Sequence, residues 1–282
     1  MLQSIVIDRK SIPMTISQGV SSWLESSKEE INEASLQEME NALYRFFTAR
    51  VGLRFLVQHH ILSDPHRKPE DLLSHLQLSS SATLGCIQTD CDPVKEIRTV
   101  IENVKQQTID CYGVCPKIEL IDSRATNEGF TYAPHHLQYM VAELLKNACR
   151  ATVDRCSGSD DAMPPIRVVV SQGGEDVTIK VADNGGGAPR STMEQIWKFA
   201  HSTSPDLEEN TDFGKDAFSG TKIRGFGLPL ARIYARYFGG ELTLLSTEGH
   251  GMDAYLYLPR LGSSCEKLQS ERIKSWQSQL RR

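Results

Sequence analysis

Residues 143–150, ELLKNACR, place polar side chains in a segment otherwise built like a buried helix. Glu143 and Asn147 are four residues apart, and Arg150 follows almost one turn later. This spacing puts the three side chains along one face of a helix, within reach of a single ligand. Because polar groups removed from water cost free energy unless something binds them, this face predicts a ligand site.

The residue types around this face suit a nucleotide. Asn147 would supply the hard oxygen that Mg²⁺ prefers, with phosphates completing the coordination. Asp183 ends a predicted buried strand and could accept a hydrogen bond from an amino group such as that of adenine. Gly185 and Gly187 follow it, and glycine would let the backbone approach a flat base.

Two further segments fit the phosphate end of such a ligand. Residues 225–229, GFGLP, precede a predicted helix whose first backbone N–H groups would bind phosphates. Ser202 and Thr203 open a long polar stretch without periodicity, which indicates a lid or a disordered loop. Alone, each segment also fits an ordinary turn or a solvated helix face. Their combination predicts a nucleotide and Mg²⁺ pocket closed by a lid at 201–224.

The N-terminal part is predicted to be helical. Arg50 lies on the apolar stripe of a helix from Ala34 to about His60, and Arg54 follows one turn later. A charged residue on such a stripe needs a partner, either an internal salt bridge or a bound anion. Asp92 and Pro93 predict the start of a second helix. The stripe of the first helix is formed by Leu36, Met39, Leu43, Phe46, Leu53 and Val57.

From about residue 116 the pattern mixes strands and helices. It predicts a strand near 115–122, a helix at 134–154, a hairpin at 166–183, a helix at 228–238 and a closing hairpin at 241–260. Ser191 and Glu194 form a possible capping box, which predicts one more helix there. The fold class is therefore α+β, with a helical unit before a mixed α/β sandwich.

Composition excludes several functions. The 282 residues carry a net charge of −5, which gives no footprint for general nucleic-acid binding. No apolar run reaches the ~18 residues that a membrane span needs. The seven cysteines form no CxxC pair, so a reducing compartment is favoured over a disulfide scaffold. Cys111 and Cys115 lack a second ligand pair at metal-binding spacing.

Two short motifs point elsewhere. Residues 212–214 read DFG, but the Gly-rich loop, strand lysine and HRD loop of eukaryotic protein kinases do not precede them. His60 stands in HILSDP with the spacing of a bacterial phospho-accepting histidine box, although Ile61 replaces the acidic residue that normally follows. Autophosphorylation on His60 therefore stays open as an alternative.

The order of the polar segments resembles the GHKL ATPase superfamily, and within it the mitochondrial 2-oxo-acid dehydrogenase kinases for pyruvate and branched-chain substrates. The resemblance covers about residues 10–262 and is carried by ARVGLRFLVQHH, ELLKNACRAT, DNGGG, ST, GFGLPLARIYARYFGGEL and STEGHGMDAYLYL. It implies an N-terminally truncated helical bundle at 1–115, a Bergerat-type α/β sandwich with the catalytic ATP site at 116–262, and a polar tail at 263–282.

The same resemblance implies an ATP-dependent protein-serine kinase that inactivates the dehydrogenase component of a mitochondrial 2-oxo-acid complex. Glu143 would be the general base and Asn147 would hold Mg²⁺. Arg50 and Arg54 would line a pocket for a small 2-oxo-acid regulator. Further implied partners are the lipoyl-bearing core of the complex and a second copy of the chain. The nucleotide contacts would be Lys146, Asn147, Arg150, Asp183, Gly185, Gly187, Ser202, Thr203, Gly225, Phe226, Gly227 and Leu228.

The chain departs from the family pattern at three places. Ile223 and Arg224 replace the leading Gly-Phe of the longer glycine box. Tyr139 stands one turn before Glu143, where pyruvate dehydrogenase kinases usually have histidine and the branched-chain kinase tends to have tyrosine. The transit peptide and first bundle helices of the family have no counterpart, so a mitochondrial matrix location rests on the resemblance alone. The substrate complex stays open, as does a catalytically weak nucleotide-binding module.

Overall fold

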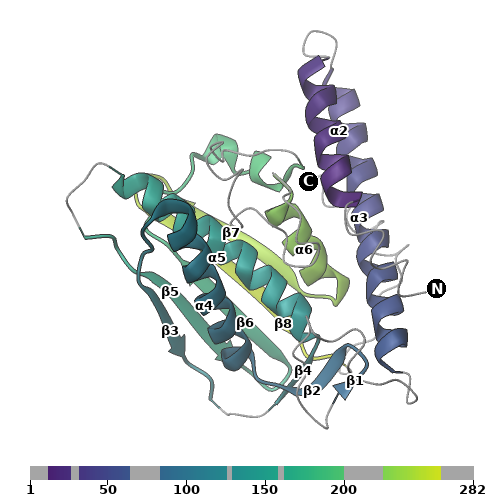
Figure 1. Cartoon of the computed structure of the whole chain (residues 1–282), viewed down its shortest axis with the longest axis vertical. Helices are drawn as coiled ribbons and strands as arrows, with labels where there is room; N and C mark the ends of the chain where they lie inside the picture. Colours follow the sequence, from purple (N-terminus) through teal and green to yellow (C-terminus); the bar gives the residue numbers. More distant parts are fainter. Residues whose placement is uncertain are drawn as a thin grey trace.

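The computed structural model describes residues 12–26, 32–63, 83–125, 129–157, 162–199 and 225–261. Two helices, α2 (Ile12–Ser26) and α3 (Glu33–Leu62), lie side by side next to a layered unit of sheet and helices (Figure 1). Asn32 caps α3, because its side-chain oxygen accepts a hydrogen bond from the Ser35 N–H at 2.8 Å. The expected first helix is therefore confirmed.

The buried face of α3 differs from the predicted stripe. Leu43 is buried as expected, but Phe46 and Leu53 are 42% and 54% exposed. The face that packs against the rest of the protein is Leu43, Phe47, Val51 and Phe55. Apolar residues occur on both sides of α3, so periodicity could not choose between the two faces. The choice is made by the α/β unit against which the helix packs.

A five-stranded sheet forms one layer of that unit, in the order β3-β5-β6-β8-β7. The pairing of β3 with β5 is parallel and all other pairings are antiparallel. Both predicted hairpins are present, since β6 follows β5 and β8 follows β7 directly. The strands are Ile118–Asp122, Ile166–Gln172, Asp176–Ala182, Glu241–Thr247 and Gly251–Pro259, for β3, β5, β6, β7 and β8 respectively.

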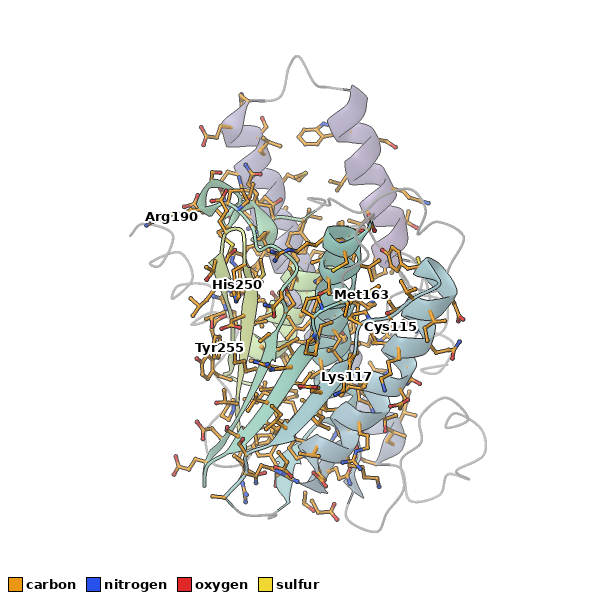
Figure 2. The ribbon with its side chains drawn as sticks, turned by 90° about the vertical axis from the view of Figure 1, so that its left-hand side faces the viewer. Cys115, Lys117, Met163, Arg190, His250 and Tyr255 are labelled. Atoms are coloured by element: carbon orange, nitrogen blue, oxygen red, sulfur yellow. The ribbon has the colours of Figure 1, made fainter. Side chains whose placement is uncertain are left out.

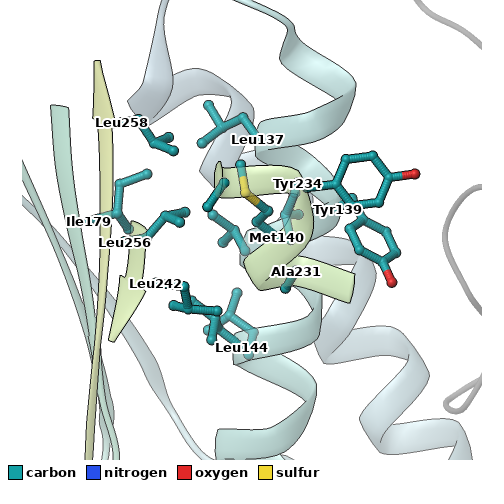
Figure 3. Packing of buried hydrophobic residues seen from close by; sticks show 14 of the residues in the cluster. Leu137, Tyr139, Met140, Leu144, Ile179, Ala231, Tyr234, Leu242, Leu256 and Leu258 are labelled. Atoms are coloured by element: carbon teal, nitrogen blue, oxygen red, sulfur yellow. The ribbon is translucent and has the colours of Figure 1, made fainter. Parts of the chain in front are cut away.

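Helices α4 (Pro93–Tyr112), α5 (Pro134–Cys156) and α6 (Gly227–Tyr237) cover one face of this sheet (Figure 1). Alternate strand residues point toward them, as in the buried series Val177, Ile179 and Val181 of β6. Figure 3 shows α5 and α6 contributing apolar side chains that meet those of β6, β7 and β8. The core of the protein lies between this helical layer and the sheet.

Two local predictions were wrong. A second, three-stranded sheet joins β1 (Thr83–Leu84) and β2 (Ile87–Cys91) to β4 (Phe130–Tyr132), whereas only helices were expected before residue 110. The supposed helix after Ser191 consists of two 3₁₀ turns, Arg190–Thr192 and Gln195–Trp197, and the Glu194 side chain makes no capping hydrogen bond. Short strands and 3₁₀ turns need tertiary partners that local sequence signals do not reveal.

The fold class is confirmed as α+β, with a helical N-terminal region and an α/β sheet region. The domain boundary expected at residue 115 stays a prediction. Contacts cross this position in the structure, because α4 packs against α5 and β2 pairs with β4. No described helix combines the length and the apolar character that crossing a bilayer requires.

Candidate functional site

Helix α5 carries the predicted polar face. Leu144, Leu145 and Ala148 are buried, and Figure 3 shows Leu144 pointing toward the strands. Asn147 and Arg150 are half-buried on the other side of the helix. The 3.6-residue period of the helix explains this division, because it places the apolar residues on one face of α5 and the polar residues on another.

Glu143 lies at the centre of the site. It is only 8% exposed and pairs with the ammonium group of Lys146, which is 7% exposed. Its other carboxylate oxygen lies against the Cα of Gly227, the first residue of α6, so closely that a Cβ there would collide with it. The carboxylate thus lies between the Lys146 ammonium group and the N-terminus of α6. Such a group can accept a proton.

Asp183 follows β6 and is held by two backbone groups. Its Oδ1 accepts hydrogen bonds from the N–H of Gly185 at 2.8 Å and of Met252 at 3.3 Å. Burial raises the pKa of the Asp183 carboxyl, and these two hydrogen bonds oppose the rise. Both bonds go to the same oxygen, Oδ1.

The glycines after Asp183 bring the loop against its neighbours. A Cβ on Gly185 would meet the side chain and backbone of Ala151 in α5, at 2.5 Å and 2.7 Å. Gly187 has φ +65° and lies so near the backbone oxygen of Thr247 that a Cβ would come within 2.5 Å of it. Glycine is required at both positions by close approach, and at Gly187 also by the positive φ. The loop thus forms a wall next to the polar face of α5.

The N-terminus of α6 completes the arrangement. Gly225 has φ +71°, and the buried Phe226 occupies the capping position, where no side-chain hydrogen bond caps the helix among the described residues. Pro229 has no N–H, so the half-buried Gly227 and Leu228 supply the first backbone donors of the helix. Phe226 packs in a cluster of three rings, with its centroid 5.5 Å from that of Phe47 and 5.2 Å from that of Phe199, which stack on each other.

Three of the four predicted segments therefore converge. The contacts of Gly185 with Ala151 and of Gly227 with Glu143 bring residues 183–187 and 225–228 to the face of α5. Ser202, Thr203 and the predicted lid 201–224, which includes Ile223 and Arg224, lie outside the described residues. These groups fit a nucleotide: a carboxylate oxygen to accept from the amino group of a base, backbone N–H groups to donate to phosphates, and the carboxamide oxygen of Asn147 for Mg²⁺.

Two residues that hold the site together were not predicted. Arg155, at the end of α5, donates hydrogen bonds to the carbonyl oxygens of Asn184, His250 and Gly249, at 2.8, 2.6 and 3.0 Å. The hydroxyl of Ser246 accepts from the Ala188 N–H and donates to the Ala188 carbonyl, at 2.7 and 2.8 Å. Their partners are 29 to 95 and 58 residues away in sequence, so no local signal could have found them.

Arg50 and Arg54 line a small pocket between α3 and α6. Its other lining residues are Pro13, Phe47, Val51, Leu230 and Tyr234. The pocket is separate from the polar face of α5, but Leu230 and Tyr234 belong to α6, whose first residue contacts Glu143. Figure 3 shows the rings of Tyr139 and Tyr234 together on the outer side of α6, and their centroids are 4.8 Å apart.

The structure also describes the histidine and cysteine side chains of the alternative interpretations. His60 is exposed near the end of α3. Among the described residues no group of three or more histidine, cysteine, aspartate or glutamate side chains could hold a metal ion. The six cysteines in the described ranges are free thiols.

Two families match the sequence. Residues 132–262 match the family described as "Histidine kinase-, DNA gyrase B-, and HSP90-like ATPase". Residues 1–88 match the family described as "Mitochondrial branched-chain alpha-ketoacid dehydrogenase kinase". The first match covers α5, α6 and the strands β5, β6, β7 and β8 of the sheet, and the second covers α3, the helix that carries Arg50 and Arg54.

Similar proteins are mitochondrial kinases named for pyruvate dehydrogenase. The kinase of Arabidopsis thaliana is 39% identical over 86% of this chain and 63% of its own length. The kinase of Schizosaccharomyces pombe is 38% identical over 80% of this chain and 52% of its own length. Isozyme 1 of Mus musculus is 34% identical over 93% of this chain and 58% of its own length. The chain thus spans between 52% and 63% of the length of these relatives.

Proposed function

The chain belongs to the mitochondrial 2-oxo-acid dehydrogenase kinases of the GHKL ATPase superfamily, and from this premise we propose that it is an ATP-dependent protein-serine kinase. Its substrate would be the dehydrogenase component of a 2-oxo-acid dehydrogenase complex, which phosphorylation inactivates. The observation that carries the proposal is the buried Glu143 carboxylate, placed between Lys146 and the N-terminus of α6.

ATP would bind across the face of α5. The adenine amino group would donate to Oδ2 of Asp183, while the loop at Gly185 and Gly187 holds the base in place. The phosphates would accept from the N–H groups of Gly227 and Leu228, with Lys146 and Arg150 neutralising charge. Ser202 and Thr203 are proposed contacts from the family resemblance alone.

Asn147 is proposed to hold Mg²⁺ together with the phosphate oxygens. The carboxamide is half-buried on the same face as Glu143, one turn away. Mg²⁺ would neutralise charge on the phosphates during transfer. An Asn147→Ala variant should lose Mg²⁺-dependent nucleotide binding. The measurement is a titration of Mg²⁺ at a fixed concentration of a fluorescent ATP analogue, whose fluorescence reports binding.

Glu143 is proposed to accept the proton of the substrate serine as its oxygen attacks the terminal phosphate of ATP. A general base of this kind contributes roughly 10²–10⁴-fold to the rate. The Glu143→Gln variant should therefore lose at least about 100-fold in phosphorylation while its ATP affinity is retained. Full kinase activity of this variant would refute the role of Glu143, and lost ATP binding would show a structural defect instead.

One assay distinguishes between the pyruvate and the branched-chain dehydrogenase complex as substrate. Radiolabelled ATP is incubated with the chain and with either the pyruvate or the branched-chain dehydrogenase component, and the products are treated with acid. Acid-stable phosphoserine on one component supports the proposed kinase and identifies the complex. Acid-labile label on the chain supports autophosphorylation on His60. ATP binding without any label supports the nucleotide-binding module.

Arg50 and Arg54 are proposed to bind a small 2-oxo-acid regulator. Two guanidinium groups on an otherwise largely apolar pocket suit a short molecule with one carboxylate. Burial lowers the pKa of the neighbouring His136 to about 3, so that side chain adds no charge near neutral pH. The remaining expectations, a lipoyl-bearing core as partner, a homodimer and a mitochondrial matrix location, rest on the family.

A further inference from the structure

Three aromatic rings pack together at the start of α6. The ring of Phe47, from α3, stacks on that of Phe199 with the two centroids 5.4 Å apart. The ring of Phe226, the residue before α6, completes this ring cluster at 5.5 Å from Phe47 and 5.2 Å from Phe199. All three residues are at most 5% exposed. The ring cluster thus joins the N-terminal helical region to the helix whose first residue contacts Glu143.

A carboxylate of α3 holds the same cluster. Oε2 of Glu40 accepts a hydrogen bond from the backbone N–H of Phe199 at 3.1 Å. Two residues before Phe199, the centre of the Trp197 ring lies 4.2 Å from the guanidinium carbon of Arg232 in α6. In the side view of Figure 2, the short turns that begin at Arg190 lie beside the purple N-terminal helices. This segment is therefore fixed to α3 at one residue and to α6 at another.

Ring packing takes the place of a capping side chain at the start of α6. Phe226 occupies the capping position, and its side chain has no oxygen to accept from the first N–H groups of the helix. Its carbonyl oxygen accepts a hydrogen bond from the Leu230 N–H at 2.9 Å. The next residue, Gly227, lies against the Glu143 carboxylate. A shift of Phe226 would therefore move the backbone donors and disturb the contact with Glu143.

We propose that Phe47 and Glu40 are positioning residues for the ATP site, although neither belongs to the proposed nucleotide contacts. Phe47 acts through Phe226, and Glu40 acts through Phe199. The inference rests on the proposed function, in which the first N–H groups of α6 bind the ATP phosphates. Binding and phosphoryl transfer both depend on exact placement of such donors, so a small displacement of the helix end weakens the site.

The same helix offers a matched control. Phe55 is 5% exposed and Phe47 is 1% exposed, so both are core residues of α3. The ring of Phe55 packs at the other end of α6, with its centroid 5.9 Å from that of Tyr237 and 5.1 Å from that of Phe238. Phe47→Leu and Phe55→Leu therefore make the same change in the same helix, but only the first reaches the start of α6. Phe46→Leu, at an exposed ring, is a second control.

The first measurement is ATP affinity in the presence of Mg²⁺, by calorimetry on the full chain, at a temperature at which circular dichroism shows every variant folded. Phe47→Leu should raise the Kd for ATP at least about tenfold, while Phe55→Leu and Phe46→Leu change it by less than about twofold. Equal losses in Phe47→Leu and Phe55→Leu would overturn the proposal, because general loosening of the core would then explain both.

The second measurement concerns Glu40. Glu40→Ala removes the acceptor for the Phe199 N–H and should raise the Kd for ATP at least about threefold. Glu40→Gln keeps an oxygen in reach and should retain the affinity of the parent. Glu38→Ala, at an exposed carboxylate of the same helix, is the control and should have no effect. Parent-like affinity of Glu40→Ala, or an equal loss in Glu40→Gln, would overturn the role of this hydrogen bond.

Hydrogen exchange separates this inference from the proposed function. Peptides that contain Leu230 should exchange faster in Phe47→Leu than in Phe55→Leu, even without ATP, because the Leu230 N–H is bonded to the Phe226 carbonyl. Equal exchange in the two variants would overturn the positioning role. Faster exchange with unchanged ATP affinity would refute the proposed phosphate site and the role in ATP binding with it.

Discussion

The carboxylate of Glu143 lies directly against the Cα of Gly227, so the middle of α5 and the first residue of α6 define one site. This contact joins the proposed base to the helix end proposed to bind phosphates. A side chain at residue 227 would collide with the carboxylate. A substitution there therefore tests the contact without changing any charged group.

Gly227→Ala should move the Glu143 carboxylate, because the added methyl group would occupy its position. The carboxylate is the end of a flexible side chain and alanine favours a helix, so stability should change by less than about 1 kcal/mol. Phosphorylation should fall at least about tenfold, since positioning dominates phosphoryl transfer. Gly174→Ala, at an exposed turn with nothing within 4 Å of the new Cβ, is the control and should keep full activity.

Asp183→Asn should separate stability from nucleotide binding. Burial raises the pKa of Asp183, so the ionised carboxylate destabilises the folded state above that pKa, and the native form gains stability as the pH falls through it. Asparagine keeps an oxygen for the Gly185 and Met252 N–H groups and carries no charge.

The Asp183→Asn variant should thus be at least as stable as the parent at pH 7, with the difference shrinking toward pH 4, in urea melts at both pH values. Its ATP affinity should fall at least about tenfold, because an amide donor would face the adenine amino group. Unchanged ATP affinity in calorimetry would exclude Asp183 from adenine recognition. A fall in stability at pH 7 would contradict the pKa argument.

Arg155→Ala should destabilise the two loops that contain Asn184 and His250, which Arg155 contacts from the C-terminal end of α5. The variant loses three hydrogen bonds from a cation to carbonyl oxygens, and because the side chain is exposed we expect a loss of about 1–2 kcal/mol. Thermal unfolding measures this loss. Arg167→Ala removes an exposed arginine whose ion pair with Glu119 spans 3.9 Å, and it should change stability by less than about 0.5 kcal/mol. Equal effects of the two variants would contradict the bridging role.

Arg50→Ala should weaken the response to a 2-oxo acid while kinase activity without the regulator remains. Pyruvate and a branched-chain 2-oxo acid are titrated separately, and the concentration for half inhibition should rise at least about tenfold for the one that binds. Arg45→Ala is the control on the same helix, because Arg45 is exposed and does not line the pocket. If Arg45→Ala and Arg50→Ala respond alike, the pocket is not the regulator site.

Local sequence was sufficient for the elements of the site. The helix α5, its polar face at Glu143, Asn147 and Arg150, and the start of α4 at Asp92 all follow from spacing and capping rules that act over one or two turns. The two hairpins of the sheet follow from alternation and turn glycines in the same way.

Tertiary structure decided which residues are in contact. Which face of α3 is buried depends on α6, against which α3 packs, because Phe46 and Phe47 are equally apolar and only packing distinguishes them. The contacts of Gly227 with Glu143 and of Gly185 with Ala151 join residues that no periodicity connects. Sequence by itself thus determined the elements and the residue types of the site, since those depend on neighbours along the chain. Only the folded chain decided their contacts, because these depend on neighbours in space.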